Sequence, residues 1–129
     1  MRIVKDVMVE NAVTISPFAK LREALRLMKK HKIKSLVVDK NSDHDAWGLI
    51  TYTNILKTVI AEEGDIDLLN VYDICAKPVI TVGEDLAVRH AATLMVQSKV
   101  KRLLVVSNND LRGIVTMNDI MEAVLQQID

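Results

Sequence analysis

The chain repeats itself, and this internal duplication constrains its fold more than any other feature. At an offset of 67 residues, positions 4–38 align with positions 71–105 and are identical at 11 of 35 places. A two-residue length difference follows in a polar stretch, and identity then resumes, as in Thr51 and Thr116. Because two copies of about 60 residues are too few for a solenoid, we expect two half-domains packed about a pseudo-two-fold axis.

Each copy shows the same succession of hydrophobic patterns. A short apolar stretch precedes a helical pattern, two apolar strands follow, and an amphipathic helix ends the copy. In the first copy, Ser16 is expected as the helix N-cap, with Pro17 at the first helical position. The first helix of each copy has an apolar stripe. In the first copy it is Leu21, Ala24, Leu25 and Met28, and in the second copy it is Val88, Ala91, Ala92 and Met95. The sequence predicts a mixed α/β (α+β) fold of two pseudo-symmetric β-α-β-β-α units packed through their sheets.

The repeat also predicts the domain boundaries. The first unit is expected over residues 1–62 and the second over residues 71–129. Between them, residues 63–70 belong to an acidic stretch that reads as a linker.

Composition argues against several classes of protein. Seventeen basic and seventeen acidic residues leave no net charge, and one Phe, two Tyr and one Trp are few for stacking on bases, so nucleic-acid binding is not expected. No apolar run approaches the length that spans a bilayer. Cys75 is the only cysteine, which excludes an internal disulfide and fits a cytoplasmic location. The three histidines have no partners at metal-ligand spacing, so no metal site is expected.

The stretches GLITYTN and GIVTMND, which end the two copies' strands, carry the pattern Thr-x-x-Asn or Thr-x-x-Asp. Thr116 and Asp119 are spaced as in a capping box, in which a threonine and an acidic residue satisfy the first N–H groups of a helix. The same two side chains also have oxygens that could hold a ligand. The residues alone leave both readings open.

Three motifs in fixed order, each present twice, resemble a known family. They are Asp6-Val7-Met8 before AVTI, the helix ends KKHKIKSLVV and QSKVKRLLVV, and the Gly-to-Asx stretches above. The chain resembles a tandem pair of cystathionine β-synthase (CBS) domains, a Bateman module, from about Ile3 to Leu125. The resemblance implies a stand-alone regulatory sensor without catalysis, which binds an adenosine-containing ligand in the cleft between its repeats and often pairs into dimers.

The resemblance also assigns roles to individual residues. Asp119 would bind the ribose hydroxyls, with Thr116 near the phosphate and Asn118 beside them. Lys101 and Arg102 match the family's basic pair and would neutralise the phosphate. The residues expected around the base come from the first copy and are Val13, Thr14, Ile33 and Lys34.

The first copy departs from this pattern. Asn54 stands where the second copy has Asp119, and an amide carries no charge and only one acceptor oxygen. Ser35 replaces the arginine equivalent to Arg102. A second site built on Thr51, Asn54 and Thr81 is therefore expected to be weak or empty.

These features favour a sensor of AMP, ADP, ATP, NAD or S-adenosylmethionine that requires no cofactor. A ligand-free scaffold for dimerisation and protein interaction is the alternative. An enzyme is not expected, because the sequence shows no nucleophile with its base and no Walker-type glycine loop. The last helix of each copy, rich in Ile, Val, Leu and Met, is the expected homodimer surface, and the regulated partner protein is not identified by the sequence.

Overall fold

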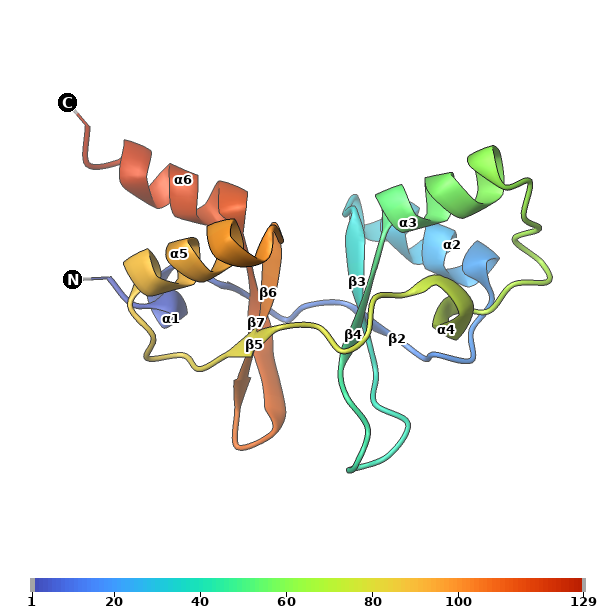
Figure 1. Ribbon diagram of the computed structural model, residues 1–129, viewed down its shortest axis with the longest axis horizontal. Helices are drawn as coiled ribbons and strands as arrows, with labels where there is room; N and C mark the ends of the chain where they lie inside the picture. Colours follow the sequence, from blue (N-terminus) through green and yellow to red (C-terminus); the bar gives the residue numbers. More distant parts are fainter. Residues whose placement is uncertain (1, 129) are drawn as a thin grey trace. The chain divides into compact units, whose positions relative to one another are not determined.

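The structure, a computed structural model, describes residues 2–128 and divides them into two compact units (Figure 1). Unit 1 combines residues 2–12 with residues 80–128, and unit 2 comprises residues 13–79. Each repeat therefore contributes its first residues to the unit that holds most of the other repeat.

The predicted boundaries follow the repeat and not these compact units. The division expected from the repeat stays a prediction. It has a first repeat at 1–62, a linker at 63–70 and a second repeat at 71–129.

Unit 2 contains a three-stranded sheet in the order β2-β3-β4. Its elements are β2 (Thr14–Ile15), α2 (Leu21–His31), β3 (Ser35–Val38), β4 (Gly48–Thr51), α3 (Tyr52–Leu56), the π-helix η1 (Lys57–Ala61) and α4 (Val71–Ile74). Strand β3 runs parallel to β2 and antiparallel to β4. In Figure 1 the helices of this unit lie on one side of its sheet.

Unit 1 contains a four-stranded sheet in the order β1-β7-β6-β5. Its elements are α1 (Val4–Val7), β1 (Val9–Glu10), β5 (Thr81–Val82), α5 (Val88–Ser98), β6 (Arg102–Ser107), β7 (Asp110–Thr116) and α6 (Met117–Leu125). Strand β1 pairs antiparallel with β7, with Val9 opposite Ile114. Strand β1 is thus an edge strand of this sheet.

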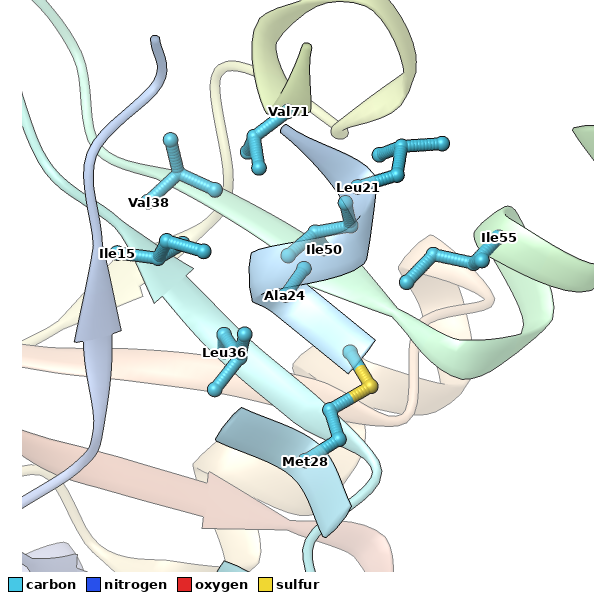
Figure 2. Close-up of a cluster of buried hydrophobic side chains, with 9 residues drawn as sticks. All are labelled: Ile15, Leu21, Ala24, Met28, Leu36, Val38, Ile50, Ile55 and Val71. Atoms are coloured by element: carbon cyan, nitrogen blue, oxygen red, sulfur yellow. The ribbon is translucent and has the colours of Figure 1, made fainter. Parts of the chain in front are cut away.

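Each unit has its own hydrophobic core, built from the predicted helical stripes. In unit 2, Leu21, Ala24 and Met28 of α2 are buried against strand residues that include Ile50 (Figure 2). Removing a side chain such as Leu21 from water contributes roughly 1.5–3 kcal/mol. The predicted mixed α/β architecture, with β-α-β-β-α in each unit, is confirmed.

The predicted start of the first long helix is wrong. Helix α2 begins at Leu21, whereas Ser16 forms a turn in which its Oγ accepts from the Phe18 N–H at 3.1 Å. The Leu21 N–H instead donates to the Leu69 carbonyl at 3.0 Å. Because a neighbouring segment satisfies the first helical N–H groups, no side-chain cap is needed.

The short helices α1 and α4, of four residues each, were not predicted from the sequence. Within residues 2–128 no helix is long and apolar enough to cross a bilayer. The longest, α2 and α5, have 11 residues each.

Candidate functional site

Thr116 and Asp119 form a reciprocal capping box at the start of α6. The Asp119 N–H donates to Thr116 Oγ1 at 3.2 Å. In return, Asp119 Oδ2 accepts from the Thr116 N–H at 2.8 Å and from the Thr116 hydroxyl at 2.9 Å. The capping role, one of the two readings of this motif, is confirmed.

The cap engages only one oxygen of the Asp119 carboxylate. Within residues 2–128 the other oxygen, Oδ1, accepts no hydrogen bond, and the side chain is half-buried. An ionised carboxylate has about four acceptor positions, so capacity for a ligand remains. Capping and ligand binding are therefore compatible, and the ligand role of Asp119 stays a prediction.

Two basic residues lie next to this box. Arg102 is directly opposite Thr116 in the antiparallel β6–β7 ladder, so both side chains emerge on one face with Cβ atoms roughly 5 Å apart. The Met117 N–H donates to the Lys101 carbonyl at 2.9 Å. In the described part of the chain, neither the Lys101 ammonium nor the Arg102 guanidinium forms an ion pair. Asn118 is exposed in the first turn of α6.

Unit 2 repeats the box with one chemical difference. The Asn54 N–H donates to Thr51 Oγ1 at 3.2 Å, and Asn54 Oδ1 accepts from the Thr51 N–H and hydroxyl at 3.1 and 2.9 Å. Because the amide has a single oxygen, the group that remains is Nδ2, a donor. Ser35 lies opposite Thr51 in the β3–β4 ladder. Unit 1 thus has a free acceptor on Asp119 and an arginine opposite Thr116, and unit 2 has neither at the equivalent positions.

The residues expected around the base lie in unit 2, whereas Asp119 lies in unit 1. Val13 and Ile33 pack against the core of unit 2. Thr81 lies in unit 1, on β5, opposite Leu104. The shared role of the two units in one ligand site stays a prediction.

Lys34 and Thr14, the other two residues expected around the base, each interact with a side chain of unit 2. The Lys34 ammonium lies 5.5 Å from the centre of the Tyr52 ring, a cation–π contact. Burial raises the pKa of the Asp39 carboxyl, and a hydrogen bond with the Thr14 side chain opposes that shift. Asp39 was not among the predicted site residues.

A cavity of about 160 Å³ lies beside Asp119 within unit 1. Helix α6 lines it with Asp119 and Glu122, and the chain's first residues line it with Arg2 and Asp6. Sequence reasoning missed Arg2 and Asp6 as neighbours of Asp119, since nothing in the hydrophobic pattern shows that each repeat donates its first residues to the other unit.

Unit 2 has a cavity at the repeat-equivalent place, of about 370 Å³. It is lined by Asn54, Lys57, Leu69 and Asp73, which stand where unit 1 has Asp119, Glu122, Arg2 and Asp6. Of these four equivalent pairs of lining residues, only Asp6 and Asp73 are the same residue type. The two cavities therefore differ in charge although the fold around them is repeated.

The described residues also bear on metal binding and on thiol chemistry. Residues 2–128 contain no group of three or more His, Cys, Asp or Glu side chains that could hold a metal ion. Cys75 is half-buried, and burial raises the pKa of its thiol, which keeps the thiol protonated near neutral pH.

The fold and the two Thr-x-x-Asx boxes define a tandem pair of similar domains, and comparison with known proteins gives the family. Residues 4–61 and 71–126 match the CBS domain. The chain belongs to the CBS domain family.

Individual relatives agree with this assignment. An uncharacterised protein of Methanopyrus kandleri is 36% identical over 120 residues, which cover 92% of this chain. The chain spans 61% of the length of that relative.

Solved structures are similar over nearly the whole chain. A hexameric CBS-CP12 protein from bloom-forming cyanobacteria has a TM-score of 0.91 and 30% identity, covering 100% of this chain and 76% of that one. A CBS domain pair in complex with 5′-methylthioadenosine and S-adenosyl-L-methionine has a TM-score of 0.84 and 26% identity, covering 98% of each chain.

Proposed function

We propose that this chain is a noncatalytic regulatory module that binds an adenosine-containing ligand through Thr116 and Asp119. Two observations carry the proposal: the Asp119 Oδ1 accepts no hydrogen bond within residues 2–128, and Arg102, which forms no ion pair there, lies opposite Thr116 in the β6–β7 ladder. A carboxylate oxygen suits the ribose hydroxyls, and such charge-assisted hydrogen bonds contribute roughly 1.5–3 kcal/mol each. A guanidinium suits a phosphate or carboxylate on the same ligand.

The comparison between the two boxes supports a role beyond capping. Asn54 makes the same three hydrogen bonds to Thr51 that Asp119 makes to Thr116. An amide is therefore sufficient for the cap, although a carboxylate near a helix N-terminus gains a few tenths of a kcal/mol, up to about 1, from the helix dipole. The charge of Asp119 is thus available for another purpose.

The ligand class rests on what the known complexes share. The related domain pair holds 5′-methylthioadenosine and S-adenosyl-L-methionine, both of which carry an adenosyl group. AMP, ADP, ATP and NAD carry the same group with phosphates attached. We propose that Asp119 recognises the shared ribose, with Val13, Thr14, Ile33 and Lys34 contributing around the base, and that Thr51, Asn54 and Thr81 form at most a weaker second site.

The proposed module works as a homodimer that passes occupancy to a partner protein. Helix α6 exposes three large apolar side chains at helical spacing, Met121, Val124 and Leu125, and a contiguous apolar patch of this kind suits a protein–protein contact. A ligand can shift such an assembly only through different affinities for two of its arrangements. A cytoplasmic location, predicted from the single cysteine, belongs to this proposal.

A ligand-free scaffold is the second candidate, and one observation favours it. The capping box alone accounts for every hydrogen bond that the side chains of Thr116 and Asp119 make within residues 2–128. In a scaffold, both side chains would act only as caps.

Thermal unfolding with a ligand panel separates the two candidates. The panel contains AMP, ADP, ATP, NAD, S-adenosylmethionine and 5′-methylthioadenosine, with GMP as the control for the base. A ligand at 100 times its Kd adds roughly 2.7 kcal/mol to the free energy of unfolding, which shifts Tm by several degrees. A shift with an adenosyl ligand and none with GMP supports the sensor. No shift with any member supports the scaffold, and turnover of a nucleotide would contradict both.

A further inference from the structure

The cavity beside Asp119 has walls from two parts of the chain that are more than a hundred residues apart in sequence. One wall is α6, and the other is the leading segment, which we define as residues 2–10. Asp119 and Glu122 face the cavity from α6, and Arg2 and Asp6 face it from the leading segment. The cavity exists only while the segment is docked on unit 1.

The leading segment is docked by its backbone, by one fully buried side chain and by the half-buried Val7 and Met8, which pack against the core of unit 1. The Val4 N–H donates to the Leu86 carbonyl at 2.8 Å, and the Val88 N–H donates to the Arg2 carbonyl at 3.0 Å. The Val4 side chain is fully buried in the core of unit 1. Strand β1, which ends the segment, adds to the sheet at β7.

A direct contact also joins the segment to α6 across the cavity. Arg2 Nη2 donates to Gln126 Oε1 at 3.3 Å. On the segment side, Asp6 Oδ2 accepts from the Ile3 N–H at 3.0 Å, and its other oxygen accepts no hydrogen bond within residues 2–128. Asp6 and Asp119, which both line the cavity, therefore each keep one carboxylate oxygen without a hydrogen bond in the described residues.

We infer that the leading segment is a working part of the ligand site, so that ligand binding at Asp119 and docking of residues 2–10 stabilise each other. This inference rests on the proposed function. A group held in the cavity touches both walls. By linkage, a ligand that binds more tightly when the segment is docked must bind more weakly when docking is weakened. The cavity volume is below the roughly 300 Å³ of typical ligand pockets. It can therefore enclose one polar part of a ligand, such as a sugar, and leaves the rest outside.

The repeat supplies a matched control for testing this coupling. Val71 is the repeat equivalent of Val4, is also fully buried, and anchors α4 in unit 2. We expect Val4→Ala to weaken affinity for the adenosyl ligand identified by the thermal panel at least five-fold, the lower end of typical coupling between sites. Val71→Ala should change it less than two-fold. Arg2→Ala, which removes the exposed contact with Gln126 and part of the cavity wall but no buried side chain, serves as the second variant if Val4→Ala does not fold.

Hydrogen exchange provides a readout that a purely structural role would not change. In the wild-type chain, ligand at about ten times its Kd should slow amide exchange in residues 4–10, and Asp119→Asn at the same ligand concentration should lose most of this protection. Equal loss of affinity in Val4→Ala and Val71→Ala, or exchange in residues 4–10 that the ligand does not alter, would overturn the coupling while leaving the proposed function intact. A wild-type chain that binds no member of the panel would overturn both.

Discussion

Arg102 lies directly opposite Thr116 in the β6–β7 ladder, whereas Ser35 occupies the same place opposite Thr51 in unit 2. The two repeats thus present the same threonine with and without a neighbouring cation. If the proposed function holds, we expect this pair of positions to separate the recognition of a phosphate from the recognition of the rest of a nucleotide.

Replacing Arg102 by serine should discriminate between ligands by their charge. Arg102→Ser makes unit 1 resemble unit 2, so we expect AMP affinity to fall about ten-fold, the equivalent of one charge-assisted hydrogen bond. Affinity for uncharged 5′-methylthioadenosine should stay within two-fold. Isothermal titration with both ligands checks this, and a parallel loss for both would show that Arg102 does not act on the phosphate.

Helix α6 should form the dimer contact. Leu125→Glu places a charge within its exposed apolar stripe, so we expect the dimer to dissociate at least ten-fold more readily without loss of secondary structure. Sedimentation equilibrium measures the association constant. Lys5→Glu, an exposed change on α1, is the control. An unchanged association constant in Leu125→Glu would place the dimer contact elsewhere.

The Asp45–Lys77 pair should make the stability of unit 2 depend on pH. Lys77 Nζ donates to Asp45 Oδ2 at 2.6 Å, and this hydrogen bond is the largest cause that lowers the pKa of Asp45 to about 2. A carboxyl whose pKa is lower in the folded state contributes stability above its unfolded pKa of 3.8, and this contribution is lost as pH falls toward 2.

The measurement for this pair is urea unfolding of wild type and Lys77→Met between pH 2 and pH 7. The difference in unfolding free energy should be constant above pH 5 and shrink as pH falls from about 4 to about 2. Lys20→Met, in which the lost ammonium contacts only the Leu68 carbonyl, is the control and should show no such decline. A difference that does not vary with pH would rule out the ion pair as its source.

The compact units, and not the sequence repeats, should be the folding units. A fragment of residues 13–79 keeps Val71, which is fully buried, and the backbone pairing between Leu49 and Ala76. A fragment of residues 1–62 loses both. We expect a cooperative thermal transition by circular dichroism for the first fragment and none for the second. The reverse result would show that the repeat boundaries govern folding.

Much of the architecture could be predicted from the sequence, because it depends on patterns repeated in both copies. The apolar stripe of Leu21, Ala24 and Met28 identified a buried helix face, and the Thr-x-x-Asx spacing identified the start of a helix. The start of α2 could not be predicted, since the Leu21 N–H is satisfied by Leu69, far away in the sequence. Local capping rules do not include such a contact.

The candidate site was predictable only in part for a similar reason. Thr116, Asp119 and Arg102 lie on adjacent elements whose pairing follows from the β-hairpin. Arg2 and Asp6 reach Asp119 only because the leading segment joins the unit of the other repeat. Sequence periodicity contains no signal for that exchange.

The most direct test of the account is titration of the Asp119→Asn variant with the adenosyl ligand that gives the largest thermal shift. Asparagine keeps the cap, as Asn54 does, but turns the free acceptor into a donor. The account predicts that the unfolding free energy changes by less than about 1 kcal/mol while affinity falls roughly 10- to 100-fold. Asn54→Ala should leave affinity within two-fold. Undiminished binding by Asp119→Asn would contradict the central claim that this carboxylate holds the ligand.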